Sequence, residues 1–148
     1  MTSFVDLIKD AKAGADLQGL VEAIPYQRYL GISVAETDDG LIATLPSDEK
    51  LIGNPMLPAI HGGVIGAFLE TTAIFQLLWA GQTLHVPKTI TITIDFMRSA
   101  TPVDTFGRAT ITKLGSRIAY VRATAWQSDP AKPVAAANAN FLIRPIES

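Results

Sequence analysis

Residues 60–81 read IHGGVIGAFLETTAIFQLLWAG, a nearly uninterrupted apolar run that opens with a histidine and two glycines. Its length is close to the roughly 20 residues that a membrane-spanning helix needs. Glu70 stands in the middle of the run, however, and a lone carboxylate at the centre of a bilayer is costly. We therefore predict a core helix that is buried on nearly all sides inside a folded domain.

The other segments predict a sheet that can cover this helix. A broken amphipathic helix is expected over residues 3–24, interrupted near Gly14 and stopped by Pro25. Strands are expected over residues 29–36, 40–45, 88–97, 105–114, 117–127 and 133–143, and an irregular loop over residues 46–60. A curved antiparallel sheet with one apolar face would supply the cover. The sequence therefore predicts an α+β fold, with an N-terminal helical segment over residues 1–25 and the main domain over residues 26–148.

The strand expected over residues 88–97, KTITITIDFM, has the clearest alternation in the chain. Successive side chains of a strand point to opposite faces. One face should therefore carry Ile90, Ile92, Ile94 and Phe96, and the other Thr89, Thr91, Thr93 and Asp95.

The composition is that of a globular chain and disfavours several other classes. Apolar residues make up 48% and charged residues 18% of 148 residues, which fits one folded domain. A net charge of -2 without a cluster of Lys and Arg argues against a nucleic-acid partner. The absence of cysteine excludes disulfides, thiolate metal sites and a cysteine nucleophile. Because the N-terminus lacks the pattern of a signal peptide, we expect a cytoplasmic protein. Because residues 60–81 are expected to be a core helix and not a membrane span, we expect no membrane partner.

The order of elements and a short motif together resemble a known family. His61-Gly62-Gly63 opens the long helix, and an acidic residue, Glu70, follows nine positions after the histidine. The similarity extends over residues 29–144 and includes Gly31-Ile32, Asn54, Phe96-Met97-Arg98 and the segment 134–141. The chain resembles the hotdog-fold acyl-CoA thioesterases of the phenylacetate-degradation type. This resemblance implies a curved antiparallel sheet wrapped around one long central helix.

Glu70 is the first candidate for catalysis. Most glutamates reach solvent at a helix edge or pair with an arginine, but the neighbours of Glu70 along the helix are almost all apolar. A buried and unpaired carboxylate is costly, and such positions are often functional. The resemblance implies that Glu70 attacks the thioester or activates water for its hydrolysis.

The His61-Gly62-Gly63 motif is the second candidate. A histidine before two glycines can simply cap the helix, and the glycines can simply permit close packing. Alternatively, the amide N–H groups of the first helical turn form an oxyanion hole that polarises the thioester carbonyl. The resemblance assigns the donor role to Gly62, with His61 orienting the loop or holding the substrate and Gly63 beside them in substrate binding.

Four further residues are weaker candidates. Asn54 matches a family position that contacts the reacting carbonyl or the water, but it also fits an ordinary turn residue before a proline. Thr89 matches a position where relatives place a hydroxyl near the water, but it also fits a surface threonine. Arg98 and Arg117 lie near expected turns and are candidates for contact with the phosphates of coenzyme A.

These residues together predict a hydrolase that cleaves an acyl-CoA to a free acid and CoA. No metal is expected, because two histidines without clustered acids do not form a metal site. No cofactor is expected either, because the thioester is already activated and CoA is part of the substrate. Two alternatives stay open: a non-catalytic acyl-CoA or fatty-acid-binding protein, and a hotdog enoyl-CoA hydratase or dehydratase.

The spacing between His61 and Glu70 predicts an oligomer. Nine residues of helix span roughly 13 Å, so the end and the middle of one helix do not reach the same thioester. A second subunit whose helix lies antiparallel beside the first would place its Glu70 near Gly62 of the first, and would do so at both sites. We therefore expect an obligate homodimer, with pairing into a homotetramer left open.

Overall fold

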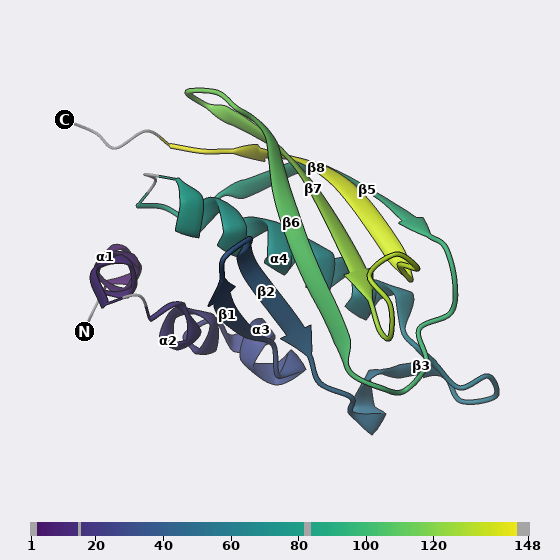
Figure 1. Cartoon of the computed structure of the whole chain (residues 1–148). Helices are drawn as coiled ribbons and strands as arrows, with labels where there is room; N and C mark the ends of the chain where they lie inside the picture. Colours follow the sequence, from purple (N-terminus) through teal and green to yellow (C-terminus); the bar gives the residue numbers. More distant parts are fainter. Residues whose placement is uncertain (1–2, 15, 82–83, 145–148) are drawn as a thin grey trace.

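The computed structural model describes residues 3–14, 16–81 and 84–144. In chain order the elements are α1 (Phe4–Gly14), α2 (Leu17–Glu22), α3 (Pro25–Leu30), β1 (Ser33–Thr37), β2 (Gly40–Leu45), a 3-10 turn η1 (Glu49–Leu51), β3 (Ile52–Asn54), β4 (Ala59–Ile60), α4 (Gly62–Ala80), β5 (Lys88–Phe96), β6 (Thr105–Leu114), β7 (Ile118–Trp126) and β8 (Ala135–Leu142). Six strands form one antiparallel sheet in the order β1-β2-β6-β7-β8-β5. The curved sheet wraps around α4, which confirms the expected hotdog fold (Figure 1).

The sheet covers α4 closely because the strands that face it carry small side chains. The inward positions of β7 and β8 are almost all alanines, and most of them are fully buried. The space they leave is filled from α4 by large buried side chains, among them Phe68, Leu69, Phe75, Leu77 and Leu78. Alanines facing large apolar residues produce an interdigitated core between the helix and the sheet.

Helix α4 is long and apolar enough to cross a membrane by length and composition. In the fold, 56% of its most apolar 18-residue window is buried. The sheet supplies this cover, so α4 is a core helix as predicted, but it is not buried on nearly all sides, because one of its faces stays partly exposed.

Helices α1 and α2 contribute to the same core as α4. Ile8, Leu20 and Val21 are almost completely buried in it. Lys12 donates from Nζ to the Gly81 carbonyl oxygen at 2.7 Å, at the C-terminal end of α4, and burial lowers the pKa of this lysine. A cation at this end complements the partial negative charge of the helix terminus. The division of the chain after residue 25 stays a prediction.

The expected start of the first strand and the expected loop over residues 46–60 were both wrong. The strand expected over residues 29–36 begins only at Ser33, because residues 25–30 form α3. Pro25 occupies the first turn of that helix, where its missing N–H costs nothing, and Gly31 ends the helix with φ +78. The segment 46–60 is also more ordered than expected, since it contains η1 and the β3–β4 pair.

The expected alternation of β5 was wrong at its first residues. Thr89 pairs with Phe141 but Thr91 pairs with Asn140, so Ile90 is an extra residue in a β-bulge. The bulge leaves Ile90 53% exposed and turns Thr89 toward α4, on the same side of the strand as Ile92.

Gly107 of β6 provides a test of the packing between helix and sheet. A Cβ at this position would lie 2.8 Å from Phe68 and 2.9 Å from Thr72 Oγ1. Gly107→Ala is therefore expected to lower the free energy of unfolding by about 1–3 kcal/mol, because the helix must shift to accept the methyl group. Chemical denaturation measures the change. Gly14→Ala is the matched control, since nothing lies within 4 Å of its added Cβ; an equal loss in both variants would contradict the packing argument.

Candidate functional site

The N-terminal end of α4 is built around His61. The His61 Nδ1 atom accepts the Gly63 N–H at 2.9 Å and thereby caps the helix. The His61 N–H donates to the Leu51 carbonyl oxygen at 2.8 Å. Gly53 allows this approach, because a Cβ there would lie only 2.7 Å from the His61 Cα. The histidine therefore has the capping role that the sequence left open, and its ring is fixed against the first turn.

Gly62 is the first residue of α4, and its N–H is not bound by the His61 cap. The Gly63 N–H is already bound by His61, whereas no acceptor for the Gly62 N–H occurs in the described part of the chain. Gly62 is also solvent-exposed. The N-terminus of a helix carries a partial positive charge, so this N–H can donate to an oxygen that develops negative charge.

A cavity of about 360 Å³ opens beside Gly62. Its walls are mostly apolar and include Phe96 and Met97 at the end of β5, with Arg98 as the charged residue. The lining residues are Ala59, Ile60, Gly62, Ile65, Phe96, Met97, Arg98, Ser99, Ala100 and Val134. A mostly apolar cavity with one cation and one available N–H suits a substrate with an apolar part and an anionic part.

Glu70 lies elsewhere on α4, eight residues and about 12 Å beyond Gly62. Its side chain is half-buried, less enclosed than the sequence suggested. The Oε2 atom accepts the Thr89 hydroxyl at 2.9 Å. Neither of the two ion pairs in the described residues involves Glu70. The carboxylate is thus oriented by one hydroxyl and keeps acceptor capacity for a further donor.

Thr89 therefore differs from the threonines that follow it in the strand. Thr91 and Thr93 are exposed on the outer face, as expected, while the bulge at Ile90 turns Thr89 toward Glu70. Glu70 with Thr89 and Gly62 with Phe96 are two separate groups within one chain. Along β5, Thr89 and Phe96 are seven residues apart, which is about 23 Å.

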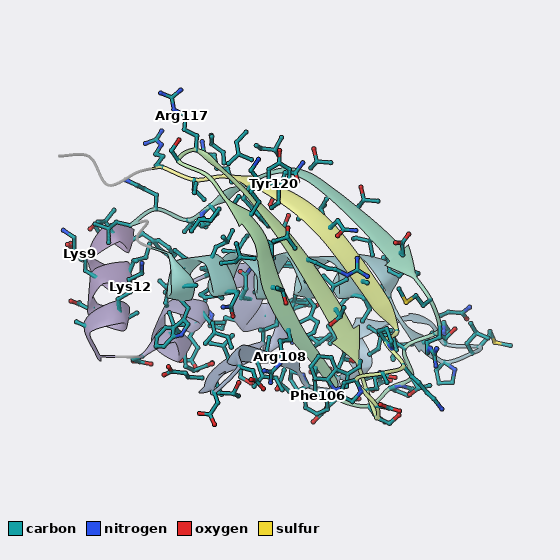
Figure 2. All side chains as sticks on the ribbon, turned by 45° about the horizontal axis from the view of Figure 1, so that its top comes forward. Lys9, Lys12, Phe106, Arg108, Arg117 and Tyr120 are labelled. Atoms are coloured by element: carbon teal, nitrogen blue, oxygen red, sulfur yellow. The ribbon has the colours of Figure 1, made fainter. Side chains whose placement is uncertain are left out.

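Asn54 and Arg117 do not join either group. Asn54 ends β3, is exposed, and accepts the Met56 N–H with its Oδ1 atom at 3.0 Å, which is the geometry of a turn residue. Arg117 stands at the turn between β6 and β7, and its side chain points away from the body of the molecule (Figure 2). Arg98 is the expected phosphate-binding residue that does line the cavity.

A second cavity, of about 310 Å³, lies at the Thr89 end of β5. It is lined by His85, Val86, Lys88, Leu142 and Arg144, so three of its five residues are basic. No group of three His, Asp or Glu side chains suited to a metal ion occurs in residues 3–14, 16–81 and 84–144. Lysine and arginine side chains around a cavity can contact an anionic group.

Sequence reasoning missed the part of Phe96 and Met97 in the cavity wall. Both side chains are large, and they are 58% and 47% exposed. Their signal was the apolar end of the strand expected over residues 88–97, where the alternation predicts Phe96 on the isoleucine face and no role for Met97. Their role in the cavity wall could have been recognised only by knowing that β5 lies at the edge of the sheet.

Comparison with known proteins gives a family and a set of similar structures. Residues 57–134 match the family model of the thioesterase superfamily. The structure of a Chromobacterium violaceum protein is 36% identical, covers 95% of this chain and 98% of its own, and superposes with a TM-score of 0.78.

Two more distant structures share the fold. A phenylacetic acid degradation-related protein from Ralstonia eutropha is 21% identical, with 80% and 89% of the two chains covered and a TM-score of 0.69. A Bacillus halodurans protein that was solved with CoA is 18% identical, with 95% and 93% covered and a TM-score of 0.73. No curated protein matches the sequence.

Proposed function

Because this chain belongs to the thioesterase superfamily, we propose that it hydrolyses the thioester of an acyl-CoA, with an aromatic or a short to medium acyl group. The observation that carries the proposal is that one apolar helix bears two groups suited to acyl transfer. These are the available N–H of Gly62 at its end and the Thr89-oriented carboxylate of Glu70 in its middle. Acyl transfer needs both an electrophilic donor and a base or nucleophile.

In the proposed reaction the thioester carbonyl oxygen accepts the Gly62 N–H. Glu70 then either removes a proton from water, which attacks the carbonyl carbon, or attacks the carbon itself to form an anhydride that water opens. In both cases the C–S bond breaks and the CoA thiolate takes up a proton. The acid gains its new oxygen directly from water in the first route; in the second it gains it from Glu70, whose carboxylate is restored by the water that opens the anhydride. A single turnover in oxygen-18 water distinguishes the routes, since only the anhydride route leaves label in Glu70.

The proposal requires a homodimer, and two features of the single chain support it. The face of α4 that carries Glu70 is only half-buried, and Val64, Ala67 and Ile74 share that partial exposure. Strand β5 lies at the edge of the sheet, with one ladder of backbone groups not paired by β8. A helix face and a strand edge left open side by side provide a self-complementary surface for a two-fold partner.

The lengths of β5 fit this assembly. If two β5 strands pair antiparallel about a centre at Thr93, Ile92 of one subunit falls opposite Ile94 of the other, and the extra residue at the Ile90 bulge brings Thr89 opposite Phe96. Glu70, which accepts the hydrogen bond from Thr89, then approaches the cavity beside the other subunit's Gly62. We propose that both sites of the dimer are shared in this way, and that two dimers can pair into a tetramer.

The same pairing offers a path for the CoA phosphates. Lys88 of one subunit would fall opposite Met97 of the other, next to Arg98, and would join the basic cavity to the apolar one. We propose Arg98 and Lys88 as the phosphate contacts, with Lys88 in place of the predicted Arg117. A protein of this fold that was solved with CoA supports a CoA ester as substrate, and we propose a cytoplasmic location and no cofactor.

Release of free thiol from a panel of acyl-CoA esters tests the activity. The panel contains short, medium, long and aromatic acyl groups, and hydrolysis of at least one of them well above the uncatalysed rate is expected. Tight binding without thiol release would identify the acyl-CoA-binding alternative. Hydration or dehydration of an enoyl or hydroxyacyl ester with the thioester intact would identify the hydratase or dehydratase alternative.

A further inference from the structure

Charged residues are unevenly distributed along the chain. Residues 1–70 contain four Lys or Arg and ten Asp or Glu. Residues 71–148 contain eight Lys or Arg and four Asp or Glu. The four strands β5 to β8 contain a single acidic residue, Asp95. This part of the sheet is therefore basic, although the whole chain has a net charge of -2.

The β6–β7 hairpin concentrates cations and aliphatic side chains at one projecting tip. It extends past the neighbouring elements at the edge of the molecule (Figure 1). The sequence of the tip is Lys-Leu-Gly-Ser-Arg-Ile over residues 113–118. Leu114 is 54% and Ile118 39% exposed, and Arg117 points outward from the tip (Figure 2).

The strand pairing extends this tip into a continuous surface. Ile118 pairs with Leu142, which in turn pairs with Lys88, so the three side chains form a row across β7, β8 and β5. Leu142 is 40% exposed, and Tyr120 is 40% exposed in the next row. We call this surface the tip patch; it consists of Ile118, Tyr120 and Leu142 with the cations Lys88, Lys113 and Arg117, whereas Leu114 pairs with the buried Ala119 and so lies on the opposite face.

Within residues 3–14, 16–81 and 84–144, the cations of the tip patch form no ion pair. The two ion pairs of the described residues, Lys50 with Asp48 and Arg108 with Asp39, lie outside the patch. Lys113 contacts the face of the Tyr120 ring, 5.9 Å from its centroid, and keeps its charge available. The patch therefore presents positive charge next to apolar surface.

We propose that the tip patch binds an anionic lipid surface. When a protein patch of this kind binds a membrane, its apolar side chains enter the boundary between headgroups and acyl chains, while its Lys and Arg side chains contact the phosphates. The projecting shape favours a fluid bilayer, which can close around the tip, over a folded acidic protein, which would need a matching groove. A two-fold contact with a second copy would bring the patch cations of both copies together, which is unfavourable.

This proposal revises the expectation of no membrane partner. That expectation came from the test for a spanning helix, and a surface that lies on a membrane does not need one. The proposal does not depend on the proposed function, and its test changes neither Glu70 nor Gly62, nor Lys88, the one patch cation that the proposed function also uses.

Vesicle co-sedimentation of the full chain tests the proposal. We expect binding to phosphatidylcholine vesicles that contain about 30% phosphatidylglycerol, little binding to pure phosphatidylcholine, and loss of binding in high salt. Each cation removed should lower the partition coefficient about fivefold, so Lys113→Glu with Arg117→Glu should lower it at least twentyfold. Ile118→Ser with Leu142→Ser should lower it about tenfold, because their apolar area no longer enters the bilayer.

Two matched controls separate the patch from general charge and apolarity. Lys132→Glu makes the charge change of one of the two patch substitutions in an exposed loop at the other end of β7 and β8, and Val103→Ser removes an apolar side chain that is 49% exposed elsewhere. Both should bind vesicles like the wild type.

Three results would overturn the proposal. The first is no binding to the anionic vesicles, or an equal loss in the Lys132 control. The second is binding to a polyglutamate peptide as tight as to vesicles and unchanged by the serine variants, which would indicate an acidic protein partner. The third is a smaller oligomer of Ile118→Ser by light scattering without vesicle binding by the wild type, which would indicate a contact between copies.

Discussion

Glu70→Gln is expected to lower kcat/KM for the best acyl-CoA substrate by about 10³-fold, within the range of 10²–10⁴ typical of a lost acid–base or nucleophilic group. The amide has nearly the same shape as the carboxylate and can still meet the Thr89 hydroxyl, so the fold should be kept. It is neither a base nor a nucleophile, whichever route the reaction takes. Initial rates of thiol release measure the loss, and circular dichroism checks the fold.

Two companion variants make this result specific. Thr89→Val keeps the shape of the side chain but removes the hydroxyl that orients Glu70, so a smaller loss of about tenfold is expected. Glu49→Gln makes the same chemical change at an exposed glutamate of η1 and should leave the rate unchanged. Activity of Glu70→Gln within tenfold of the wild type would remove Glu70 from the chemistry.

Most of the fold could be predicted because its strongest signals are long and periodic. The apolar run of α4 and the strands β2, β6, β7 and β8 have boundaries close to those expected. The failures occurred where one residue has two roles. Pro25 ends one helical segment and begins α3, and only the second role makes residues 29 and 30 helical.

The bulge in β5 could not be predicted because it depends on the neighbouring strand. The pattern Thr-Ile-Thr-Ile fits perfect alternation, and the extra residue becomes visible only in the pairing of β5 with β8. That single insertion decides whether Thr89 faces solvent or Glu70.

For the candidate site, residue types were easier to predict than their arrangement. An acid in an apolar helix and a glycine amide at its start are local features, so Glu70 and Gly62 could be chosen from the sequence. The role of Asn54 depends on its own turn, and the place of Arg117 depends on where a hairpin ends relative to the cavity. The first is a local choice between two roles that an asparagine can take, and only the second depends on contacts between distant parts of the chain.

Complementation between two inactive variants tests whether the site is shared between subunits. Gly62→Pro removes the proposed N–H donor at the first helical position, where proline is tolerated. The preceding residue already has φ -57 and ψ 131, a conformation that a following proline accepts. A Cβ at Gly62 would lie 3.5 Å from Phe96, an ordinary contact. Gly62→Pro should therefore fold and dimerise but lose most activity, as Glu70→Gln does.

Refolding equal amounts of the two variants together should restore activity. If each site takes Gly62 from one subunit and Glu70 from the other, every mixed dimer has one intact site and one doubly altered site. Random pairing makes half of the dimers mixed, so total activity should reach about one quarter of the wild type. Differently tagged chains allow the mixed dimer to be purified and its composition verified, and the two variants mixed without unfolding serve as the control. Verified mixed dimers that stay as inactive as their parents would show that both groups act from one chain, and the antiparallel pairing of β5 would then have to be abandoned.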